Sequence, residues 1–361
     1  MSLGLEGLRD VDAARAIAAE IAEESRQPLK LMEVCGSHSH AIARYGLHDL
    51  LPDTIELVPG PGCPVCVAPQ EEIDLAIELA RDPGVVLTTF GDLIRVPGTH
   101  ASMDQVRAEG GDVRIVLSPM DALATARQEP QRLVVFVAIG FETTAPGVAA
   151  TVRAAEADGV DNFSLLVAHK TMPAPMRALV EAGECGVQGF ICPGHVSTII
   201  GSEAYRFLPD EYGVACAVAG FEPLDVLLAV RSLVRQHETG QPQVDTQYGR
   251  AVRAEGNPKA LGILNEVFEV RDSRWRGLGE IPVSGLGLAE RYRSFDVEDR
   301  LGLARHPVEP NPACRCGEVL RGIMRPMSCP AFGKACTPED PLGPCMVSSE
   351  GACAAAWQYR S

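Results

Sequence analysis

Residues 133–168 read LVVFVAIGFETTAPGVAATVRAAEADGVDNFSLLVA, and the pattern within this stretch predicts the fold. Two short apolar runs, 133–139 and 163–168, flank a segment with helical spacing, GVAATVRAAEADG. An apolar run, an amphipathic helix and a second apolar run are typical of a unit whose two strands lie parallel in one sheet. The stretch therefore predicts an α/β protein.

The same alternation of apolar runs and helical segments extends over most of the chain. The predicted strands are 31–34, 55–58, 85–89, 113–117, 133–139, 163–168, 187–191 and 214–219. Because so many runs exceed what one open sheet usually holds, we expect two Rossmann-like parallel α/β domains, residues 1–125 and 126–240, with a boundary near 122–131. Beyond Gly240 the alternation stops, and residues 241–361 are expected to form a mixed, irregular, cysteine-rich third domain.

Charge and composition exclude several classes of protein. The 361 residues carry a net charge of −16, which argues against non-specific binding to nucleic acid or to an anionic membrane. No apolar run approaches the roughly 18–20 residues that span a bilayer, and the first residues contain acids where a signal peptide carries bases. We expect a cytoplasmic protein, in which twelve cysteines favour metal ligation or redox chemistry over a disulfide framework.

Polar and sulfur-bearing clusters follow nearly every predicted strand. They are Cys35 with His38 and His40, Cys63 and Cys66 in GPGCPVC, 90–92, 140–144, His169 with Lys170, 192–195 and 220–222. In open parallel sheets, ligands bind beyond the carboxyl ends of the strands. The clusters are therefore expected to share one cleft between the first two domains.

Two of these clusters carry the sulfur chemistry. Cys63 and Cys66 form a CxxC pair, whose spacing suits either two ligands of one metal or a reversible disulfide. A structural zinc site would need a second CxxC, which the first two predicted domains lack. Cys35 with His38 and His40 is a compact set of soft and borderline ligands, suited to iron.

The remaining clusters are less specific. Glu142, Thr143, Thr144 and His195 are predicted to line the cleft, although Thr144 before Pro146 is also typical of a helix start. No phosphate-binding glycine motif is present, so nucleotide binding has no support. Cys185 and Cys216 lie in apolar surroundings and are expected to fill the core.

The last fifty residues hold six cysteines among many glycines and prolines. Four of them, Cys329, Cys336, Cys345 and Cys353, are widely and irregularly spaced. Loops of this kind suit a cluster wrapped by thiolates better than zinc, which usually uses paired CxxC ligands. Cys314 and Cys316 are too close for ordinary two-ligand chelation and are interpreted as a thiol pair near the cluster.

Several of these motifs together resemble a known family. CGSHSHAIARYG, GPGCPVC, GFETTAP, CPGHVSTIIG and CPAFGKACTPEDPLGPCMVSSEGAC, in this order, are similar to motifs of the hydrogenase formation protein HypD family. The resemblance runs from about Leu31 to Trp357. Ser37 and Ser39 stand where the family often has Thr, so the hydroxyl is retained.

The resemblance implies a specific function. HypD proteins have two α/β domains and a [4Fe-4S] domain, and they assemble the Fe(CN)2(CO) unit of [NiFe]-hydrogenases with the chaperone HypC. The cyanide arrives as a thiocyanate on HypE, a transient partner. Such a protein is a redox-active assembly scaffold rather than a turnover enzyme, and is expected to be a monomer within the heterocomplex.

The resemblance also assigns roles to residues of this chain. Cys35 would hold the iron with a cysteine of HypC, and His38 would assist it. Cys63 and Cys66 correspond to the family's other iron-site or redox cysteines. The thiols assigned to the [4Fe-4S] cluster are Cys329, Cys336, Cys345 and Cys353, with Cys314 and Cys316 as a possible relay.

Two other functions stay open from the residues alone. One is an iron–sulfur thiol–disulfide oxidoreductase that acts on protein disulfides. The other is a zinc-stabilised α/β binding protein. Bound iron with acid-labile sulfide would exclude the second, and bound diatomic ligands would exclude the first.

Overall fold

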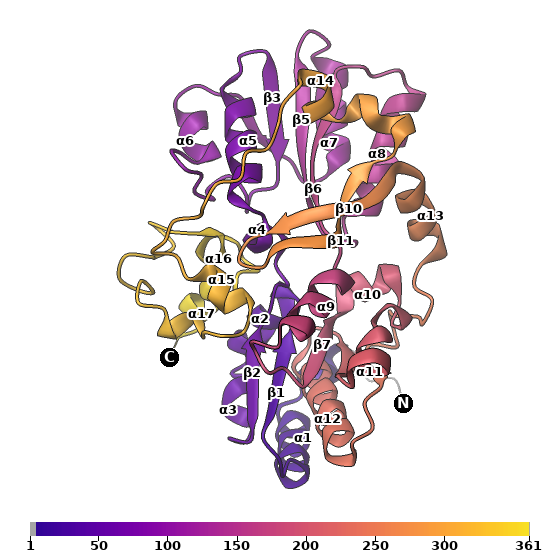
Figure 1. Cartoon of the computed structure of the whole chain (residues 1–361), viewed down its shortest axis with the longest axis vertical. Coiled ribbons are helices and arrows are strands. Elements are labelled where there is room, and N and C mark those ends of the chain that lie inside the picture. Colours follow the sequence, from indigo (N-terminus) through magenta and orange to yellow (C-terminus); the bar gives the residue numbers. More distant parts are fainter. Residues whose placement is uncertain (1–4, 361) are drawn as a thin grey trace.

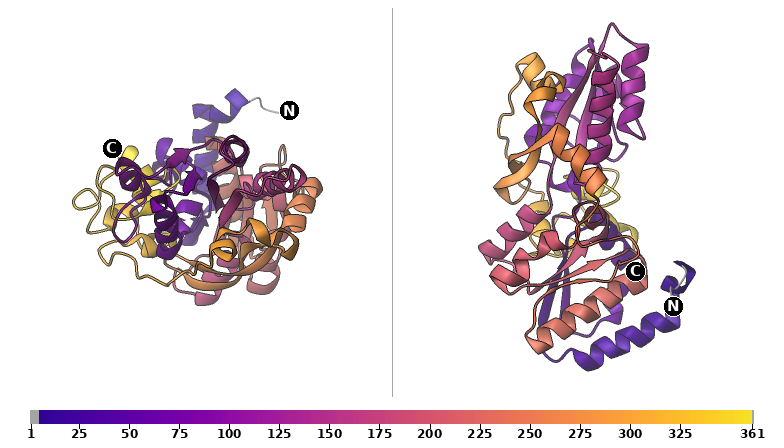
Figure 2. Two further views of the ribbon diagram at one scale, coloured as in Figure 1. Left: turned by 90° about the horizontal axis from the view of Figure 1, so that it is seen from above. Right: turned by 90° about the vertical axis from the view of Figure 1, so that its right-hand side faces the viewer.

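The computed structural model describes residues 5–360, which form two lobes stacked along the long axis of the molecule (Figure 1). Each lobe contains one parallel sheet with helices packed against it (Figure 2). The cysteine-rich tail, yellow in Figure 1, lies beside the junction of the lobes. The predicted α/β class with parallel sheets is confirmed.

The first sheet forms the lower lobe of Figure 1, with strand order β2-β1-β7-β8-β9. Its strands are β1 (Leu29–Glu33), β2 (Ile55–Pro59), β7 (Gly189–Pro193), β8 (Ala215–Ala219) and β9 (Val244–Thr246). The second sheet forms the upper lobe, in the order β4-β3-β5-β6. Its strands are β3 (Val85–Thr89), β4 (Val113–Ile115), β5 (Leu133–Gly140) and β6 (Phe163–His169).

The stretch 133–168 forms the expected parallel unit. β5 and β6 pair in parallel from Val134 opposite Phe163 to Gly140 opposite His169. Every residue of β6, and all of β5 after Leu133, is buried. Strands covered on both faces read as continuous apolar runs, which is why this segment gave so clear a pattern.

The expected boundary at residues 122–131 is wrong, because it would separate β3 from β5, which pair directly. The chain instead leaves the first sheet after β2, builds the second sheet, and returns after β6. On its return β7 pairs with β1, with Gly189 opposite Leu31. Apolar runs indicate that strands exist, but they do not encode which distant strand each will join.

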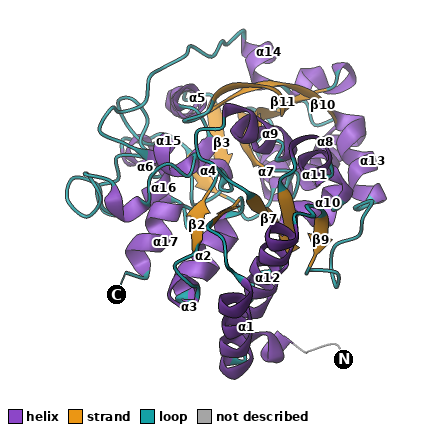
Figure 3. Cartoon of the chain, turned by 60° about the horizontal axis from the view of Figure 1, so that its bottom comes forward, coloured by secondary structure: helices purple, strands orange, loops and turns teal. Residues whose placement is uncertain are grey.

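Helices cover both sheets. In the lower lobe α1 (Val11–Glu24) lies beside α12 (Pro223–Thr239), as Figure 3 shows. Arg235 reinforces this contact, since its Nη2 donates to Glu24 Oε1 at 2.6 Å. The other helices before α12 are α2 (Gly36–Arg44), α3 (Leu47–Leu50), α4 (Pro64–Val67), α5 (Gln70–Arg81), α6 (Met103–Ala108), α7 (Pro119–Gln128), α8 (Ala145–Ala157), α9 (Pro173–Ala182), α10 (Gly194–Ile200) and α11 (Phe207–Tyr212).

Residues 241–305 differ from the irregular domain that was expected. β9 extends the first sheet, and α13 (Pro258–Val267) is followed at once by the antiparallel hairpin of β10 (Phe268–Trp275) and β11 (Gly279–Leu288). Leu264, Phe268 and Leu286 pack in the same apolar core as Phe136 of β5. These residues therefore belong to the two lobes.

The remaining elements are short. They are α14 (Val297–Leu301), α15 (Cys316–Leu320), α16 (Pro344–Val347), α17 (Ala352–Gln358) and the 3-10 helices η1 (Leu5–Arg9), η2 (Glu203–Tyr205), η3 (Glu290–Phe295) and η4 (Pro326–Ser328). From about residue 311 onward the chain has the loop-rich character predicted for the tail. No helix within residues 5–360 combines the length and apolar character needed to cross a membrane.

One apolar core joins the lobes and the tail. It contains Met32 of the first sheet, Leu87 of the second, Cys66, Trp275 and Cys345. Because this core is close-packed, the lobes and the tail cannot shift relative to one another without losing contacts.

A buried ion network fixes the segment after α14 against the upper lobe. Lys170 Nζ lies 3.0 Å from Glu72 Oε1 and 3.0 Å from Ser273 Oγ. Arg305 donates to the same Glu72 oxygen at 2.7 Å and to Glu298 at 2.6 Å. Lys170 is 1% exposed and Glu72 3%, and charges buried so deeply are tolerated only when they are paired.

We predict that Glu72→Gln lowers the free energy of unfolding by about 3 kcal/mol or more, because it leaves Lys170 buried without its carboxylate. Urea denaturation measures the change. Adding Lys170→Met should recover part of the loss, since the unpaired charge is removed as well. An unfolding midpoint unchanged by Glu72→Gln would contradict this account of the network.

Candidate functional site

A pocket of about 240 Å³ lies between the lobes, where loops after several strands meet. Its chemically useful side chains are those of Cys35, Asp92, Thr143, Thr144, His195 and Glu350. We call it the interlobe pocket. The expectation that strand-end clusters share a cleft thus agrees with the structure for Cys35, Thr143, Thr144 and His195.

Cys35 lies one residue beyond the end of β1 and directly precedes the first residue of α2. The loop after β2 presses against it, with Gly36 N–H donating to Gly62 O at 3.0 Å. A Cβ on Gly62 would lie 2.1 Å from Cys35 N, so only glycine permits this approach. The contact places Cys35 beside the loop that leads into the CxxC pair.

The surroundings of Cys35 are buried and acidic. Burial, assisted by the negative charges of Glu350 and Glu33, raises the pKa of the Cys35 thiol to about 12. Glu33 Oε2 accepts a hydrogen bond from Cys35 N–H at 3.1 Å, and burial raises the pKa of Glu33 to about 8. A thiolate is therefore disfavoured here unless a cation compensates it, and a bound metal ion supplies such a charge.

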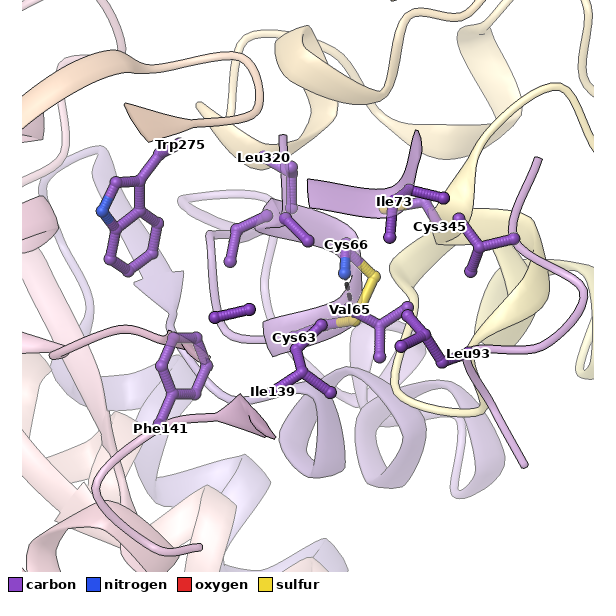
Figure 4. Close-up of a cluster of buried hydrophobic side chains, with 14 of the residues drawn as sticks. Cys63, Val65, Cys66, Ile73, Leu93, Ile139, Phe141, Trp275, Leu320 and Cys345 are labelled. Carbon is purple, nitrogen blue, oxygen red and sulfur yellow. Dashed lines mark hydrogen bonds between the residues drawn. A yellow bond between two sulfur atoms is a disulfide. The ribbon is translucent and has the colours of Figure 1, made fainter. Parts of the chain in front are cut away.

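Cys63 and Cys66 form a disulfide. Cys63 is the N-cap residue of α4, and its Sγ accepts a hydrogen bond from Cys66 N–H at 3.1 Å. The bridge is buried behind Pro64 and Val65, which line the interlobe pocket. Figure 4 shows it among apolar side chains, with Cys345 of the tail nearby.

His38 and His40 do not line the interlobe pocket. His38 is fully buried and points to the end of β8, where its Nε2 lies 2.9 Å from Gly220 O. Burial lowers the pKa of His38 to about 4, so the ring is neutral at pH 7. His40 Nε2 lies 2.9 Å from the hydroxyl of Tyr359 in α17.

Glu142 also turns away from the pocket. Its Oε1 accepts a hydrogen bond from Met172 N–H at 3.0 Å. The side chain of Thr144 does not cap α8: its hydroxyl lies 3.1 Å from His169 Nε2 and 3.3 Å from Phe141 O.

Three acidic residues near Cys35 were not predicted as site residues. Glu33 lies within a strand, and Glu350 lies between the tail cysteines, so neither position indicated a site residue from sequence. Asp92 belongs to a strand-end cluster, and this position could have identified it as a site residue. In the structure Asp92 Oδ2 accepts from Ser349 N–H at 3.0 Å, while Ser37 donates to Glu350 at 3.2 Å.

The six tail cysteines surround a second, small pocket, which we call the thiol pocket. Its cysteines are Cys314, Cys316, Cys329, Cys336, Cys345 and Cys353. The neighbouring thiol of Cys316, together with burial, raises the pKa of Cys314. The predicted cluster cysteines are thus together, and so are the two assigned to a relay.

The thiol pocket fits a group bound by thiolates. No acid or imidazole is among its lining residues, and a Cβ on Gly343 would come within 2.5 Å of Cys314 Sγ, so glycine leaves room beside that sulfur. Its free volume is only about 20 Å³, so the sulfurs must separate to admit a multinuclear cluster. Within residues 5–360, no set of three or more His, Cys, Asp or Glu is arranged around a single metal ion.

The disulfide lies between the two pockets. α4 carries Cys66 and packs against α16, which carries Cys345. Pro64 and Val65 of the same α4 line the interlobe pocket. Cys35, the Cys63–Cys66 bridge and the thiol pocket therefore follow one another across the junction.

The fold and these sites define a two-lobed α/β protein that concentrates its thiols at one junction. The family described as "HypD: Hydrogenase formation hypA family" matches residues 12–360. The chain belongs to this HypD family of hydrogenase maturation factors, and the resemblance seen in the motifs is confirmed.

Named relatives cover nearly the whole chain. Hydrogenase maturation factor HypD of Rhizobium leguminosarum bv. viciae is 49% identical over 96% of this chain and 92% of its own length. HypD2 of Bradyrhizobium diazoefficiens is 46% identical, over 97% and 95%. HypD of Escherichia coli K12 is also 46% identical, over 97% and 94%.

Glu142 gives a pH-dependent prediction. Burial raises its pKa from 4.5 to about 7. The contribution of the buried, protonated carboxyl to the free energy of unfolding is therefore fully present below about pH 4.5 and is lost as the pH rises through about 7. Glu142→Gln keeps the acceptor for Met172 and removes the charge. Between pH 5 and pH 8 the variant should gain about 3 kcal/mol relative to the unmodified chain in urea denaturation. If the free energy of unfolding of the variant and of the unmodified chain changed with pH in parallel, the prediction would be contradicted.

Gly36 gives a steric prediction. A Cβ at this position would lie 2.3 Å from Glu350 Cβ and 2.4 Å from Glu350 O. Gly36→Ala should therefore lower the free energy of unfolding by about 1–3 kcal/mol. Gly262→Ala, in α13 with open space around it, is the matched control and should raise stability by about 0.5–1 kcal/mol. Equal effects of the two substitutions would refute the close contact.

Proposed function

We propose that this chain is the scaffold on which the Fe(CN)2(CO) unit of [NiFe]-hydrogenases is assembled, with a HypC-type chaperone as partner and a HypE-type thiocyanate as cyanide donor. The observation that carries the proposal is the succession of Cys35, the Cys63–Cys66 disulfide and the thiol pocket. Family membership supplies the hydrogenase context.

Cys35 is the proposed thiolate ligand of the iron. It is the cysteine among the side chains lining the interlobe pocket, and a second thiolate is proposed to come from the HypC-type partner. The acidic surroundings that hold the Cys35 thiol protonated favour a cation in the same place. Low-spin iron with cyanide and carbonyl ligands is soft, and thiolate ligation suits it.

Other residues of the pocket are suited to orient the diatomic ligands. Thr143 and His195 line the pocket, and both can donate hydrogen bonds to cyanide nitrogens. The ring of His195 stacks on Phe221 with centroids 4.0 Å apart, which fixes its orientation. In this arrangement His38 positions the loop after β8 and does not touch the iron.

The disulfide is the proposed two-electron store. Reduction of Cys63–Cys66 by two electrons and two protons gives two thiols. Those thiols and a thiocyanate R–SCN can yield the disulfide, R–SH and HCN, with all atoms and electrons balanced. Pro64 and Val65 lie between the two cysteines of this pair and line the same pocket as Cys35. The pair is therefore close to Cys35.

Cys329, Cys336, Cys345 and Cys353 are proposed to hold a [4Fe-4S] cluster, which would supply single electrons. Cys314 and Cys316 lie in the same pocket and are proposed as a thiol relay. The alternative of an oxidoreductase acting on protein disulfides would show turnover with a generic dithiol substrate and no bound diatomic ligands. Structural zinc sites usually use paired CxxC ligands, so these irregularly spaced thiols favour a cluster over zinc.

We predict that Cys35→Ala abolishes the cyanide and carbonyl infrared bands of the protein co-produced anaerobically with its HypC- and HypE-type partners. The visible absorbance of the cluster should remain, because Cys35 lies outside the thiol pocket. Cys185→Ala, at another buried cysteine, is the matched control and should keep both signals.

Retention of the diatomic bands in Cys35→Ala would overturn the assignment of the iron site. Iron and acid-labile sulfide are measured on the same samples, with about four of each expected for the cluster. Zinc with negligible iron and sulfide would instead support the zinc-stabilised binding protein.

A further inference from the structure

The ends of β5 and β6 bring a threonine and a buried histidine together beside the interlobe pocket. Gly140, the last residue of β5, lies opposite His169, the last residue of β6. Thr144 lines the pocket, and its hydroxyl lies 3.1 Å from His169 Nε2. A Cβ on Gly140 would overlap that hydroxyl and lie 3.2 Å from His169 Nε2. Glycine at the end of β5 therefore leaves the space in which the two groups meet.

The surroundings of His169 decide which of its nitrogens carries the proton. The residue is 2% exposed, and burial, assisted by the charge of Lys170, lowers the pKa of His169 to about 3, so the ring is neutral at pH 7. A neutral imidazole has one N–H donor and one acceptor nitrogen. Within residues 5–360 Nδ1 has no hydrogen-bond partner, and orphaned buried N–H groups are rarer in proteins than under-satisfied acceptors. The proton is therefore on Nε2, which donates to the hydroxyl oxygen of Thr144.

The hydroxyl proton of Thr144 lacks a good acceptor in the described part of the chain. Its contact with Phe141 O is 3.3 Å, which is long for an O–H···O bond, whose usual length is about 2.7–2.8 Å. Phe141 O already accepts from Thr144 N–H at 3.1 Å and from Ala145 N–H at 3.3 Å, and a carbonyl oxygen has two lone pairs. The hydroxyl thus accepts from His169 and keeps its own proton for a group in the interlobe pocket.

We propose that Thr144 donates a hydrogen bond to the nitrogen end of a cyanide group in the interlobe pocket, and that His169 is a positioning residue that fixes the direction of this bond. The inference rests on the proposed function, which brings cyanide to this pocket. A buried nitrogen without a partner opposes folding, and positioning of the hydroxyl is a role that accounts for its presence in His169.

The chemistry of the pair favours cyanide over carbon monoxide at this wall of the pocket. Because His169 occupies the acceptor side of the Thr144 hydroxyl, the hydroxyl faces the pocket only as a donor. A hydroxyl that accepts from an N–H is also polarised and donates more strongly. The nitrogen of an iron-bound cyanide is a good acceptor, whereas the oxygen of an iron-bound carbonyl is a poor one.

Nitrogen NMR of the unloaded full chain tests the tautomer. Long-range proton–nitrogen correlations of the chain labelled with ¹⁵N-histidine distinguish protonated from unprotonated ring nitrogens. His169→Gln identifies the signals of this residue, because they disappear in the variant. Nε2 should be protonated and Nδ1 unprotonated at pH 7. A proton on Nδ1 would overturn the proposal.

Infrared spectra of the complex co-produced anaerobically with the HypC- and HypE-type partners test the donor. Thr144→Val removes the hydroxyl and nearly keeps the shape of the side chain. It should shift one cyanide band and move the carbonyl band less. Thr144→Ser retains the hydroxyl and should restore the position of that band. Cyanide bands unmoved by Thr144→Val would overturn the proposal.

The matched control is Thr151→Val in the same helix. Thr151 is fully buried, its hydroxyl donates to Gly147 O at 2.9 Å, and it is not among the residues that line the interlobe pocket. The control should leave every band in place. An equal shift in Thr151→Val and Thr144→Val would show that a change in α8, rather than a lost hydrogen bond to the ligand, moves the band, and the proposal would be wrong.

His169 is tested through the width of the same band. His169→Phe keeps a ring and removes the N–H, so the Thr144 hydroxyl should take several orientations and the cyanide band should broaden. His169→Gln places an amide N–H near the position of Nε2 and should narrow the band again. Unchanged position and width in His169→Phe would refute the positioning role.

Failure of the proposed function gives a different result. If the unmodified complex had no cyanide bands, the assembly role and the cyanide assignment would both be lost. Cyanide bands that are present but insensitive to Thr144→Val would leave the assembly role standing and overturn this inference alone.

Discussion

The arrangement of the site depends on one backbone contact, in which the glycine loop after β2 lies against Cys35 at the end of β1. Gly62 leaves no room for a side chain, and Gly36 donates to its carbonyl. β1 and β2 are parallel neighbours, so their carboxyl ends meet at the same edge. The contact places Cys35 beside the loop that leads into the Cys63–Cys66 pair.

The electrostatics of this edge suit a cation. Cys35, Glu33 and Glu350 lie close together, and burial raises the pKa of each. Without a compensating charge the Cys35 thiol and the Glu33 carboxyl hold protons. A cation at this edge would favour the charged forms of these groups.

The tail is held at the same edge by hydrogen bonds to both lobes. Ser348 and Ser349 bind Asp92 of the upper lobe, while Glu350 accepts from Ser37 of the lower lobe. The tail therefore contacts both lobes at the rim of the interlobe pocket. Its thiols lie behind that rim, where α16, which carries Cys345, packs against α4.

By itself the sequence determined the α/β class, the parallel strands and the concentration of chemistry at strand ends, because these follow from local periodicity and residue type. Only the tertiary structure decided that β7 joins β1, that β3 pairs with β5, and that residues 241–305 belong to the lobes. It also decided that His38 and Glu142 turn away from the interlobe pocket and that Cys63 and Cys66 are bridged. The physical reason is that strand partners and side-chain directions depend on packing between distant segments, which no local pattern encodes.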